Sequence, residues 1–107
     1  MQQPLFSIIT ITYNASRWAE QTFLNVLSQS YPHIEYIVID GGSTDGTVDI
    51  IKRYESGFAY WVSEPDKGIY DAMNKGLQKA TGDYVWFINA GDSLCTADTV
   101  QRVASLI

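Results

Sequence analysis

Acidic residues stand at the ends of several apolar runs in this sequence. Asp40 comes directly after Tyr36–Ile39, Asp66 follows a third run, and Asp92 closes the turn after Tyr84–Ile88. Because ligands bind at the carboxyl ends of strands in open parallel sheets, we expect these carboxylates to converge. Carboxylate oxygens are hard ligands that suit Mg²⁺ or Mn²⁺. The pattern predicts a site for a divalent cation and a nucleotide diphosphate.

The elements that must position these acids alternate between strands and helices. Strand-like runs occur at 7–12, 36–39, 58–63 and 84–88. Amphipathic stripes of helical spacing lie between and after them, at 19–27, 47–54, 69–80 and 100–107. Ser16 is a candidate N-cap, Gly82 is expected to close the third helix, and the run 84–88 predicts a strand buried on both faces. The order predicts an α/β fold, a Rossmann-like open and mostly parallel sheet with helices on both faces.

Composition limits the possible partners and the compartment. The 107 residues suffice for one domain, and a net charge of −5 with 7 Lys and Arg argues against nucleic acid. Cys95 is the only cysteine, which excludes an internal disulfide and fits a reducing compartment. The sequence has neither a signal peptide pattern nor an apolar run of membrane-spanning length, so we expect a cytoplasmic protein.

The loops exclude two common nucleotide-binding motifs. The residues after the first strand, Tyr13–Arg17, contain no glycine, so the Gly-x-Gly-x-x-Gly dinucleotide fingerprint is absent. A P-loop is absent as well. A receiver-like signalling domain shares the element order, but no later strand supplies its lysine, and it would not explain the glycine-rich turn at 41–46. We therefore rank it last.

Four motifs, in order along the chain, carry a resemblance to a known family. They are Ser-Ile-Ile-Thr-Ile-Thr-Tyr-Asn (7–14), Tyr-Ile-Val-Ile-Asp-Gly-Gly-Ser-Thr-Asp-Gly-Thr (36–47), Glu-Pro-Asp-Lys-Gly-Ile-Tyr-Asp-Ala-Met-Asn-Lys-Gly (64–76), and Ala-Thr-Gly-Asp (80–83) with the turn at 87–92. The chain resembles the amino-terminal part of a family 2 glycosyltransferase of the GT-A fold. These are inverting enzymes that use nucleotide sugars to build bacterial cell-envelope polysaccharides.

The resemblance implies a role for each matching residue. Asp40 would accept a hydrogen bond from the base, in a pocket lined by Thr10, Thr12 and Tyr13. Asp66 and Lys67 match the family's loop near the base and ribose. Asp92 would bind Mg²⁺ or Mn²⁺, which would bridge to the diphosphate of a UDP- or dTDP-type donor. A glycan or lipid-linked molecule would be the acceptor.

The sequence departs from the family pattern in two places. The usual Asp-x-Asp-Asp turn is Asn-Ala-Gly-Asp at 89–92, so Asp92 is the surviving acid. Met73 stands where the family often has an arginine, and Lys67 or Lys75 could replace that charge near the diphosphate. The family's general base would lie beyond Ile107, so we expect residues 1–107 to be a truncated nucleotide-sugar-binding part without transfer activity of its own.

Several residues have a structural reading beside the functional one. An acid directly after a buried strand has little evident structural purpose, which favours function for Asp40, whereas Asp45 fits a turn and helix start. The three tryptophans fit core packing, although one near Asp40 could stack on a base. Cys95 fits a small buried residue, and Tyr70 could line or cover the pocket.

Two alternatives concern the whole chain. It could be a non-catalytic nucleotide-binding module, because the base that deprotonates an acceptor is not among the matched motifs. A four-stranded sheet could also leave an edge that pairs with a second copy to form a homodimer, and the missing regions could hold the protein at the inner face of a membrane.

Overall fold

The computed structural model describes residues 3–92, 94 and 96–107, and it confirms the predicted alternation of strands and helices. The prediction for Cys95 lies outside the described residues. The elements are β1 (Phe6–Thr12), α1 (Ala19–Leu27), β2 (Ile34–Asp40), α2 (Thr47–Tyr54), a 3-10 turn (Glu55–Gly57), β3 (Tyr60–Ser63), α3 (Ile69–Lys79), β4 (Tyr84–Phe87) and α4 (Thr99–Ser105).

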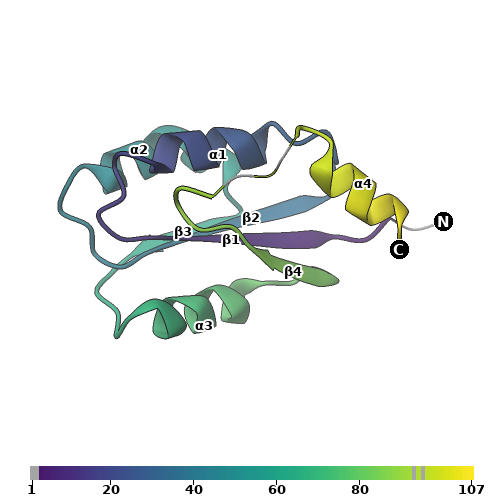
Figure 1. The fold of residues 1–107 in the computed structure, drawn as a ribbon. Coiled ribbons are helices and arrows are strands. Elements are labelled where there is room, and N and C mark those ends of the chain that lie inside the picture. The colour runs from purple at the N-terminus through teal and green to yellow at the C-terminus, as the bar shows by residue number, and fades with distance from the viewer. Residues whose placement is uncertain (1–2, 93, 95) are drawn as a thin grey trace.

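The strands form one parallel sheet in the order β3-β2-β1-β4 (Figure 1). The chain therefore builds outward from β1 in one direction through β2 and β3, and then returns to place β4 on the other side of β1. In open α/β sheets such a reversal of strand order opens a crevice at the carboxyl ends of the strands. The β1–β4 junction is that point here.

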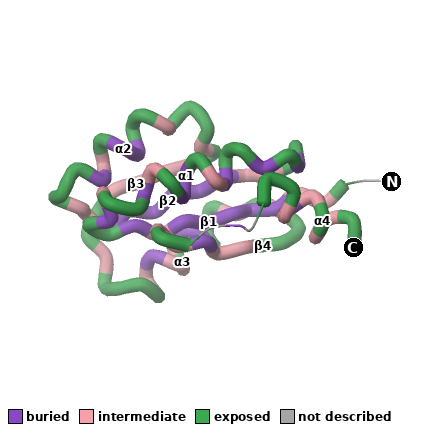
Figure 2. The backbone as a smooth tube through the Cα atoms, turned by 45° about the horizontal axis from the view of Figure 1, so that its top comes forward, coloured by how far each residue is buried: buried purple, intermediate pink, exposed green. Residues whose placement is uncertain are grey.

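Helices cover both faces of the sheet, as predicted. Helices α1, α2 and α4 lie on one face, where Phe23, Ile51 and Val100 pack into a core with Ile8 and Val38. Helix α3 covers the other face with a smaller cluster that includes Ala72. Apolar side chains of β1 and β2 alternate between these two clusters. Most residues of both strands are therefore buried, and Figure 2 colours them so along the centre of the sheet.

The prediction that 84–88 is a strand buried on both faces was wrong. Strand β4 is an edge of the described sheet, and Tyr84 and Val85 are 44% and 41% exposed. Ile88, just past the strand, is the buried residue of the run. An apolar run does not reveal whether a second strand lies beside it, and the central positions belong to β1 and β2.

Both predicted helix caps were also wrong. Helix α1 begins at Ala19, so Trp18 and not Ser16 is at the N-cap position, and no side chain makes a capping hydrogen bond there. The Ser16 backbone N–H donates to the Asp45 carboxylate. Helix α3 ends at Lys79 before Gly82 is reached. A Cβ on Gly82 would lie 2.6 Å from Ser7 Oγ, so this glycine permits the turn after α3 to pack closely against β1.

Helix α3 buries less of its apolar stripe than its periodicity suggests. Ala72 and Gly76 are buried against the sheet, whereas Ile69 and Leu77 are 50% and 44% exposed. A Cβ on Gly76 would come within 2.7 Å of the Ile9 side chain, so the glycine sets how closely the helix approaches β1. The start of α3 therefore leaves an apolar side chain, Ile69, beside the carboxyl ends of the strands.

Candidate functional site

A cleft of about 820 Å³ opens at the carboxyl end of the sheet. It is walled by the β1–α1 loop, the β2–α2 loop, the β3–α3 loop with the start of α3, and the turn after β4. The residues that line it are Ile11, Thr12, Tyr13, Asn14, Ala15, Trp18, Gly41, Gly42, Pro65, Asp66, Gly68, Ile69, Ala72, Asn89 and Ala90. Three of the predicted site residues, Thr12, Tyr13 and Asp66, are among them.

Asp40 lies beneath this cleft and is fully buried. Its Oδ1 accepts hydrogen bonds from the hydroxyls of Thr12 and Ser43, both at 2.6 Å. Its Oδ2 accepts from the Ser63 hydroxyl at 2.8 Å and from the backbone N–H groups of Gly42 and Ser43 at 3.1 and 2.8 Å. The parallel register causes this arrangement, because Thr12 and Ser63 are the partners of Asp40 on the two neighbouring strands.

The premise that an acid at this position has little structural purpose was therefore wrong. Burial acts to raise the pKa of Asp40, but the hydrogen bonds from Ser43, Thr12 and Ser63 outweigh it and hold that pKa below its usual range. The carboxylate ties three strand ends and the β2–α2 loop together. Its contact with a base stays a prediction.

Thr10 is also buried in the sheet rather than in the cleft wall. Its hydroxyl shares a 2.7 Å hydrogen bond with the Tyr36 hydroxyl. Burial raises the pKa of Tyr36, and the hydrogen bond with Thr10 opposes that rise only in part. This pair supports the floor of the site from below.

The β1–α1 and β2–α2 loops are joined by side chains that act as local caps. Asp45 Oδ1 accepts from the Thr47 hydroxyl at 2.5 Å and the Thr47 backbone N–H at 3.1 Å, and its Oδ2 accepts from the Ser16 N–H at 3.1 Å. The hydrogen bond from the Thr47 hydroxyl holds the pKa of Asp45 well below its usual range. The structural reading of Asp45, a turn and helix-start residue, is confirmed.

Asn14 completes this junction from the other loop. It adopts a left-handed backbone conformation (φ 47°), its Oδ1 accepts from the Thr44 N–H at 2.9 Å, and its own N–H donates to Ser43 Oγ at 2.7 Å. Asparagine tolerates this conformation better than most residues. The two loops that wall the cleft are therefore fixed to each other before any ligand arrives.

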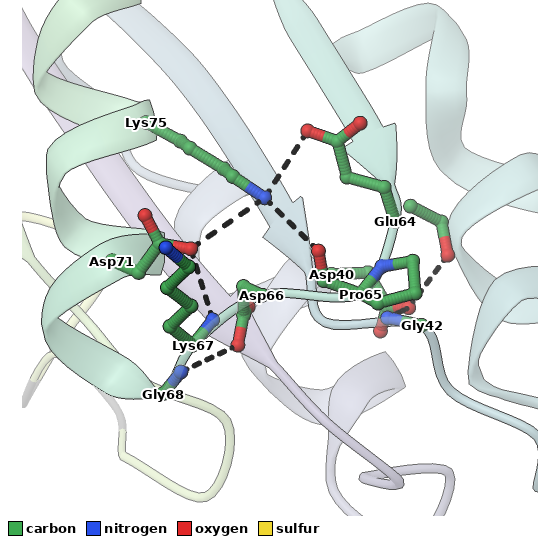
Figure 3. A network of polar contacts seen from close by, with 10 residues as sticks. Asp40, Gly42, Glu64, Pro65, Asp66, Lys67, Gly68, Asp71 and Lys75 are labelled. Carbon is green, nitrogen blue, oxygen red and sulfur yellow. Dashed lines mark hydrogen bonds and ion pairs between the residues drawn. The ribbon is translucent and has the colours of Figure 1, made fainter.

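The β3–α3 loop is held by a network of polar contacts that Figure 3 shows from close by. Lys75 Nζ on α3 lies 3.1 Å from Glu64 and 3.9 Å from Asp71, and it donates to the Pro65 carbonyl at 3.4 Å. Asp71 in turn accepts from the backbone N–H of Lys67 at 2.9 Å. The Lys75 ammonium is therefore already paired with acids of the loop and of α3. Lys67 has no carboxylate within ion-pair distance among the described residues.

The turn after β4 is anchored to α1 rather than to the sheet. The Gly91 N–H donates to Thr22 Oγ1 at 3.1 Å, Thr22 Oγ1 reaches the Asp92 carbonyl at 3.3 Å, and the Asp92 N–H closes the turn onto the Asn89 carbonyl at 2.9 Å. Gly91 has a φ of 97°, so this turn requires a residue that accepts a left-handed backbone. Asp92 itself is exposed.

Asn89 is a candidate that the sequence interpretation missed. Its Oδ1 is buried at the cleft and, among the described residues, is the one buried side-chain oxygen or nitrogen that lacks a hydrogen-bond partner. A buried acceptor without a partner is costly unless a ligand, water or ion completes it. The sequence signal was its position as the first residue of the altered acidic turn.

The Asn89 side-chain oxygen and the exposed Asp92 carboxylate belong to one turn, and they are the candidate ligands for a cation that arrives with a diphosphate. No group of three or more His, Cys, Asp or Glu side chains able to hold a metal occurs in the described ranges. Mg²⁺ typically keeps several waters and is held by one or two carboxylates together with phosphate oxygens. Asp92 and the unpartnered Asn89 oxygen would supply the few protein ligands of such a site. The described residues do not offer enough ligands to enclose a cation without the phosphate oxygens.

The expectation that the tryptophans pack in the core was wrong for Trp18. Trp61 and Trp86 do pack against the core, but Trp18 is 48% exposed and lines the cleft. The Arg17 guanidinium lies 5.2 Å from the centre of its ring, which places a cation at the cleft rim. Tyr70 is 79% exposed and is not part of the cleft lining.

Comparisons with known proteins agree with this architecture. A family model described as "Glycosyl transferase family 2" matches residues 7–107. An uncharacterized glycosyltransferase of Mycobacterium tuberculosis is 44% identical over 105 residues, which cover 97% of this chain and 40% of the relative. A PGL/p-HBAD biosynthesis glycosyltransferase of Mycobacterium bovis is 38% identical over 110 residues, which cover all of this chain and 43% of the relative. The chain thus spans about two fifths of the length of these relatives.

Solved structures share the fold across almost the whole chain. TarS from S. aureus, in complex with UDP-GlcNAc, has a TM-score of 0.86 at 26% identity, covering 96% of this chain and 31% of that protein. The mannosyltransferase PcManGT from Pyrobaculum calidifontis, in complex with GDP-Man and Mn²⁺, has a TM-score of 0.85 at 31% identity, covering 94% and 31%. The predicted GT-A arrangement of sheet and helices is confirmed.

Proposed function

The chain belongs to glycosyl transferase family 2, and on that premise we propose that it binds the nucleotide-sugar donor of a glycosyltransferase that builds cell-envelope glycans. The observation that carries the proposal is the cleft at the carboxyl ends of β1, β2 and β3, with the turn after β4 at its far wall. Support also comes from solved relatives of this fold in complex with UDP-GlcNAc and with GDP-Man. We propose a UDP- or dTDP-type donor.

Different residues in and beside the cleft would contact different parts of the donor. The exposed ring of Tyr13 offers a face on which a base can stack, and the fixed loops at 13–16 and 41–46 supply backbone groups beside it. Lys67 is next to the cleft-lining Asp66 and Gly68, and Arg17 lies against the cleft-lining Trp18, so we propose these two cations as partners of the diphosphate. Lys75 is already held by Glu64 and Asp71. Of the two lysines considered for that role, we propose Lys67.

Asp92 and Asn89 would hold Mg²⁺ or Mn²⁺ beside the diphosphate. When bound, such a cation supplies Lewis-acid stabilisation of the departing nucleoside diphosphate. The role of this chain is to fix the turn that carries both oxygens, through the contacts of Thr22 on α1 with Gly91 and Asp92. A preset turn spares the site the entropy of ordering it when the donor binds.

Further proposals concern the transfer step itself. We propose that transfer inverts the anomeric configuration, that the acceptor is a glycan or a lipid-linked glycan, and that the general base lies beyond Ile107, so that the 107-residue chain alone does not transfer sugar. This chain covers 40% and 43% of the length of the two relatives, which supports a division of the activity over a longer protein. A cytoplasmic location, with attachment to the inner face of a membrane, remains part of the proposal. A membrane-spanning helix is absent from the described part of the chain.

Calorimetry with UDP and GDP, with and without Mn²⁺, tests the proposal. We expect UDP binding that strengthens when Mn²⁺ is present, and an Asp92→Ala variant that loses the strengthening while keeping its fold. No binding of either nucleotide would overturn the proposed function.

A second candidate is a non-catalytic nucleotide-binding module, which the single remaining acid of the 89–92 turn favours. It predicts nucleotide binding that is the same with and without Mn²⁺, and that result would remove the metal role of Asp92.

A further inference from the structure

Helix α1 presents a stripe of polar side chains to the chain that follows β4. Thr22 and Asn25 lie in the helix, and Gln29 lies just past its end, where its amide also donates to the Asn25 carbonyl at 3.2 Å. Residues three and four apart lie on the same side of a helix. Thr22 and Gln29 are buried and Asn25 is half-buried, so these side chains need hydrogen-bond partners within the protein. We call Thr22, Asn25 and Gln29 the polar stripe.

The partners of the polar stripe are backbone groups of the segment between β4 and α4. The described part of this segment forms neither a helix nor a strand, so its N–H and C=O groups depend on partners from elsewhere. The contacts follow the same order along both stretches of chain: Thr22 with Gly91 and Asp92, Asn25 with Leu94, and Gln29 with Thr96 and Val100. The segment therefore runs alongside α1 toward α4, which lies on the same face of the sheet (Figure 1).

Asn25 makes both of its hydrogen bonds to a single residue of the segment. Its Oδ1 accepts from the Leu94 N–H at 2.7 Å, and its Nδ2 donates to the Leu94 carbonyl at 3.1 Å. Two residues of an antiparallel strand pair exchange hydrogen bonds in the same way. The Leu94 side chain is buried in the core beneath α1. Asn25 thus fixes the chain two residues after Asp92.

Gln29 fixes the far end of the same segment. Its Nε2 donates to the Thr96 carbonyl at 2.8 Å, and its Oε1 accepts from the Val100 N–H at 3.2 Å. Val100 is in the first turn of α4, where a backbone N–H has no acceptor within its own helix. The neighbouring Ser30 N–H donates to the Ala97 carbonyl at 2.7 Å. The path from the 89–92 turn to α4 is therefore held by side chains of one element.

We propose that Asn25 and Gln29 are positioning residues for a cation bound at the 89–92 turn, which they hold in place through the backbone without touching the cation. The inference rests on the proposed function, since it assumes that Asp92 binds a cation together with the diphosphate. The Asp92 side chain is exposed, and the contacts of this residue with the rest of the described chain are made by its backbone. The direction of the carboxylate therefore depends on how the surrounding segment is held.

Mn²⁺ titrations followed by electron paramagnetic resonance, at fixed UDP, test this role in an Asn25→Leu variant. Leucine has a similar shape but cannot form either hydrogen bond to Leu94. We expect Mn²⁺ to bind about tenfold more weakly than to the wild type, as is usual when a residue that supports a metal ligand is lost. Calorimetry without metal should give a UDP affinity within about twofold of the wild type, because the contact lies away from the rest of the cleft.

Two further variants separate this effect from general damage to α1. Gln21→Leu removes an amide from an exposed position of the same helix and should bind Mn²⁺ and UDP as the wild type does. Gln29→Met loses the contacts at the far end of the segment and leaves Asn25 in place, so it provides the test if Asn25→Leu does not fold. We expect it to weaken Mn²⁺ binding about threefold, since it acts further from the turn.

Hydrogen exchange of backbone amides, followed by NMR in the metal-free chain, reports the positioning directly. The Leu94 amide in Asn25→Leu and the Val100 amide in Gln29→Met should exchange faster, because each has lost its acceptor. The decisive amide is that of Gly91, whose own acceptor on Thr22 is intact in both variants. Its exchange should also accelerate, whereas that of Ile8 in the centre of the sheet should not change.

The outcomes distinguish this inference from the proposed function. Wild-type Mn²⁺ affinity in the folded variants, or unchanged exchange at Gly91, would overturn the inference and leave the proposed function standing. Equal weakening of Mn²⁺ binding and of metal-free UDP binding would mean that the whole cleft is disturbed, and it would overturn the inference as well. A wild-type chain that binds no nucleotide, with or without Mn²⁺, would overturn both.

Discussion

Thr12 Oγ1 donates a 2.6 Å hydrogen bond to Asp40 Oδ1, between residues that are paired in the parallel register of β1 and β2. Both side chains are buried, and the same carboxylate reaches Ser63 on β3 and the backbone at Gly42 and Ser43. The contact lies directly under the cleft. Asp40 therefore determines the shape of the cleft floor from inside the protein.

Replacing Asp40 by alanine should lower the free energy of unfolding by about 3 kcal/mol, because several buried donors lose their acceptor at once. Urea denaturation followed by tryptophan fluorescence measures this difference. Asp49→Ala, at an exposed position of α2, should stay within about 0.5 kcal/mol of the wild type. An Asp40→Ala variant as stable as the wild type would contradict the role assigned to the carboxylate.

Stability should fall in acid because of carboxyls whose pKa values are lowered by folding. Asp40 and Asp45 both have folded pKa values below their usual range, so each stabilises the fold above its unfolded pKa of about 4. That contribution is lost as the pH falls from there through the folded pKa. Unfolding free energies measured from pH 7 to pH 3 should be level at first and then decline. Asp45→Asn should make the decline shallower, and an identical profile would contradict the role of its hydrogen bonds.

Lys75→Met should weaken UDP binding by about two- to fivefold, since the contributions of partly exposed ion pairs are small. The lysine connects Glu64 and the Pro65 carbonyl to α3, and its loss should loosen the loop that carries Asp66. Calorimetry measures the change. Lys52→Met on the exposed side of α2 removes the same charge away from the cleft and should bind UDP as the wild type does. If Lys75→Met and Lys52→Met weaken UDP binding equally, the cause is the change in net charge and not the position of the β3–α3 loop.

Asn89→Asp should raise the affinity for Mn²⁺ in the presence of UDP by about tenfold, because a second carboxylate adds ligand charge to the turn. Asn89→Ala should lower that affinity by removing the unpartnered oxygen. Mn²⁺ titrations followed by electron paramagnetic resonance report bound metal directly, without any sugar transfer. If both variants bind Mn²⁺ as the wild type does, Asn89 is not part of the metal site.

The outer edge of β4 should let two copies of the chain associate. Among the described residues this edge has no neighbouring strand, and Tyr84 and Val85 are exposed on it. Light scattering of concentrated protein should show a dimer, and Val85→Lys should shift it toward monomer. A wild-type chain that stays monomeric at high concentration would count against the homodimer hypothesis.

The sequence by itself determined the elements and their order. β-Branched runs such as 7–12 and the 3.6-residue period of 69–79 express local preferences that any chain with those residues shares. The motifs around Asp40, Asp66 and Asp92 also placed three acids at the carboxyl edge, because strands that alternate with helices run parallel. These features depend on short-range physics and on the direction of the chain.

The tertiary structure decided which of those acids meets the cleft. Pairing of β1, β2 and β3 in register brings Thr12, Asp40 and Ser63 together, and so turns Asp40 inward. The close approach of the β3–α3 loop to Gly41 places the Asp66 carboxylate, instead of Asp40, at the cleft. Such contacts join residues more than twenty positions apart, and the direction of a side chain there depends on register and loop packing, which no local pattern contains.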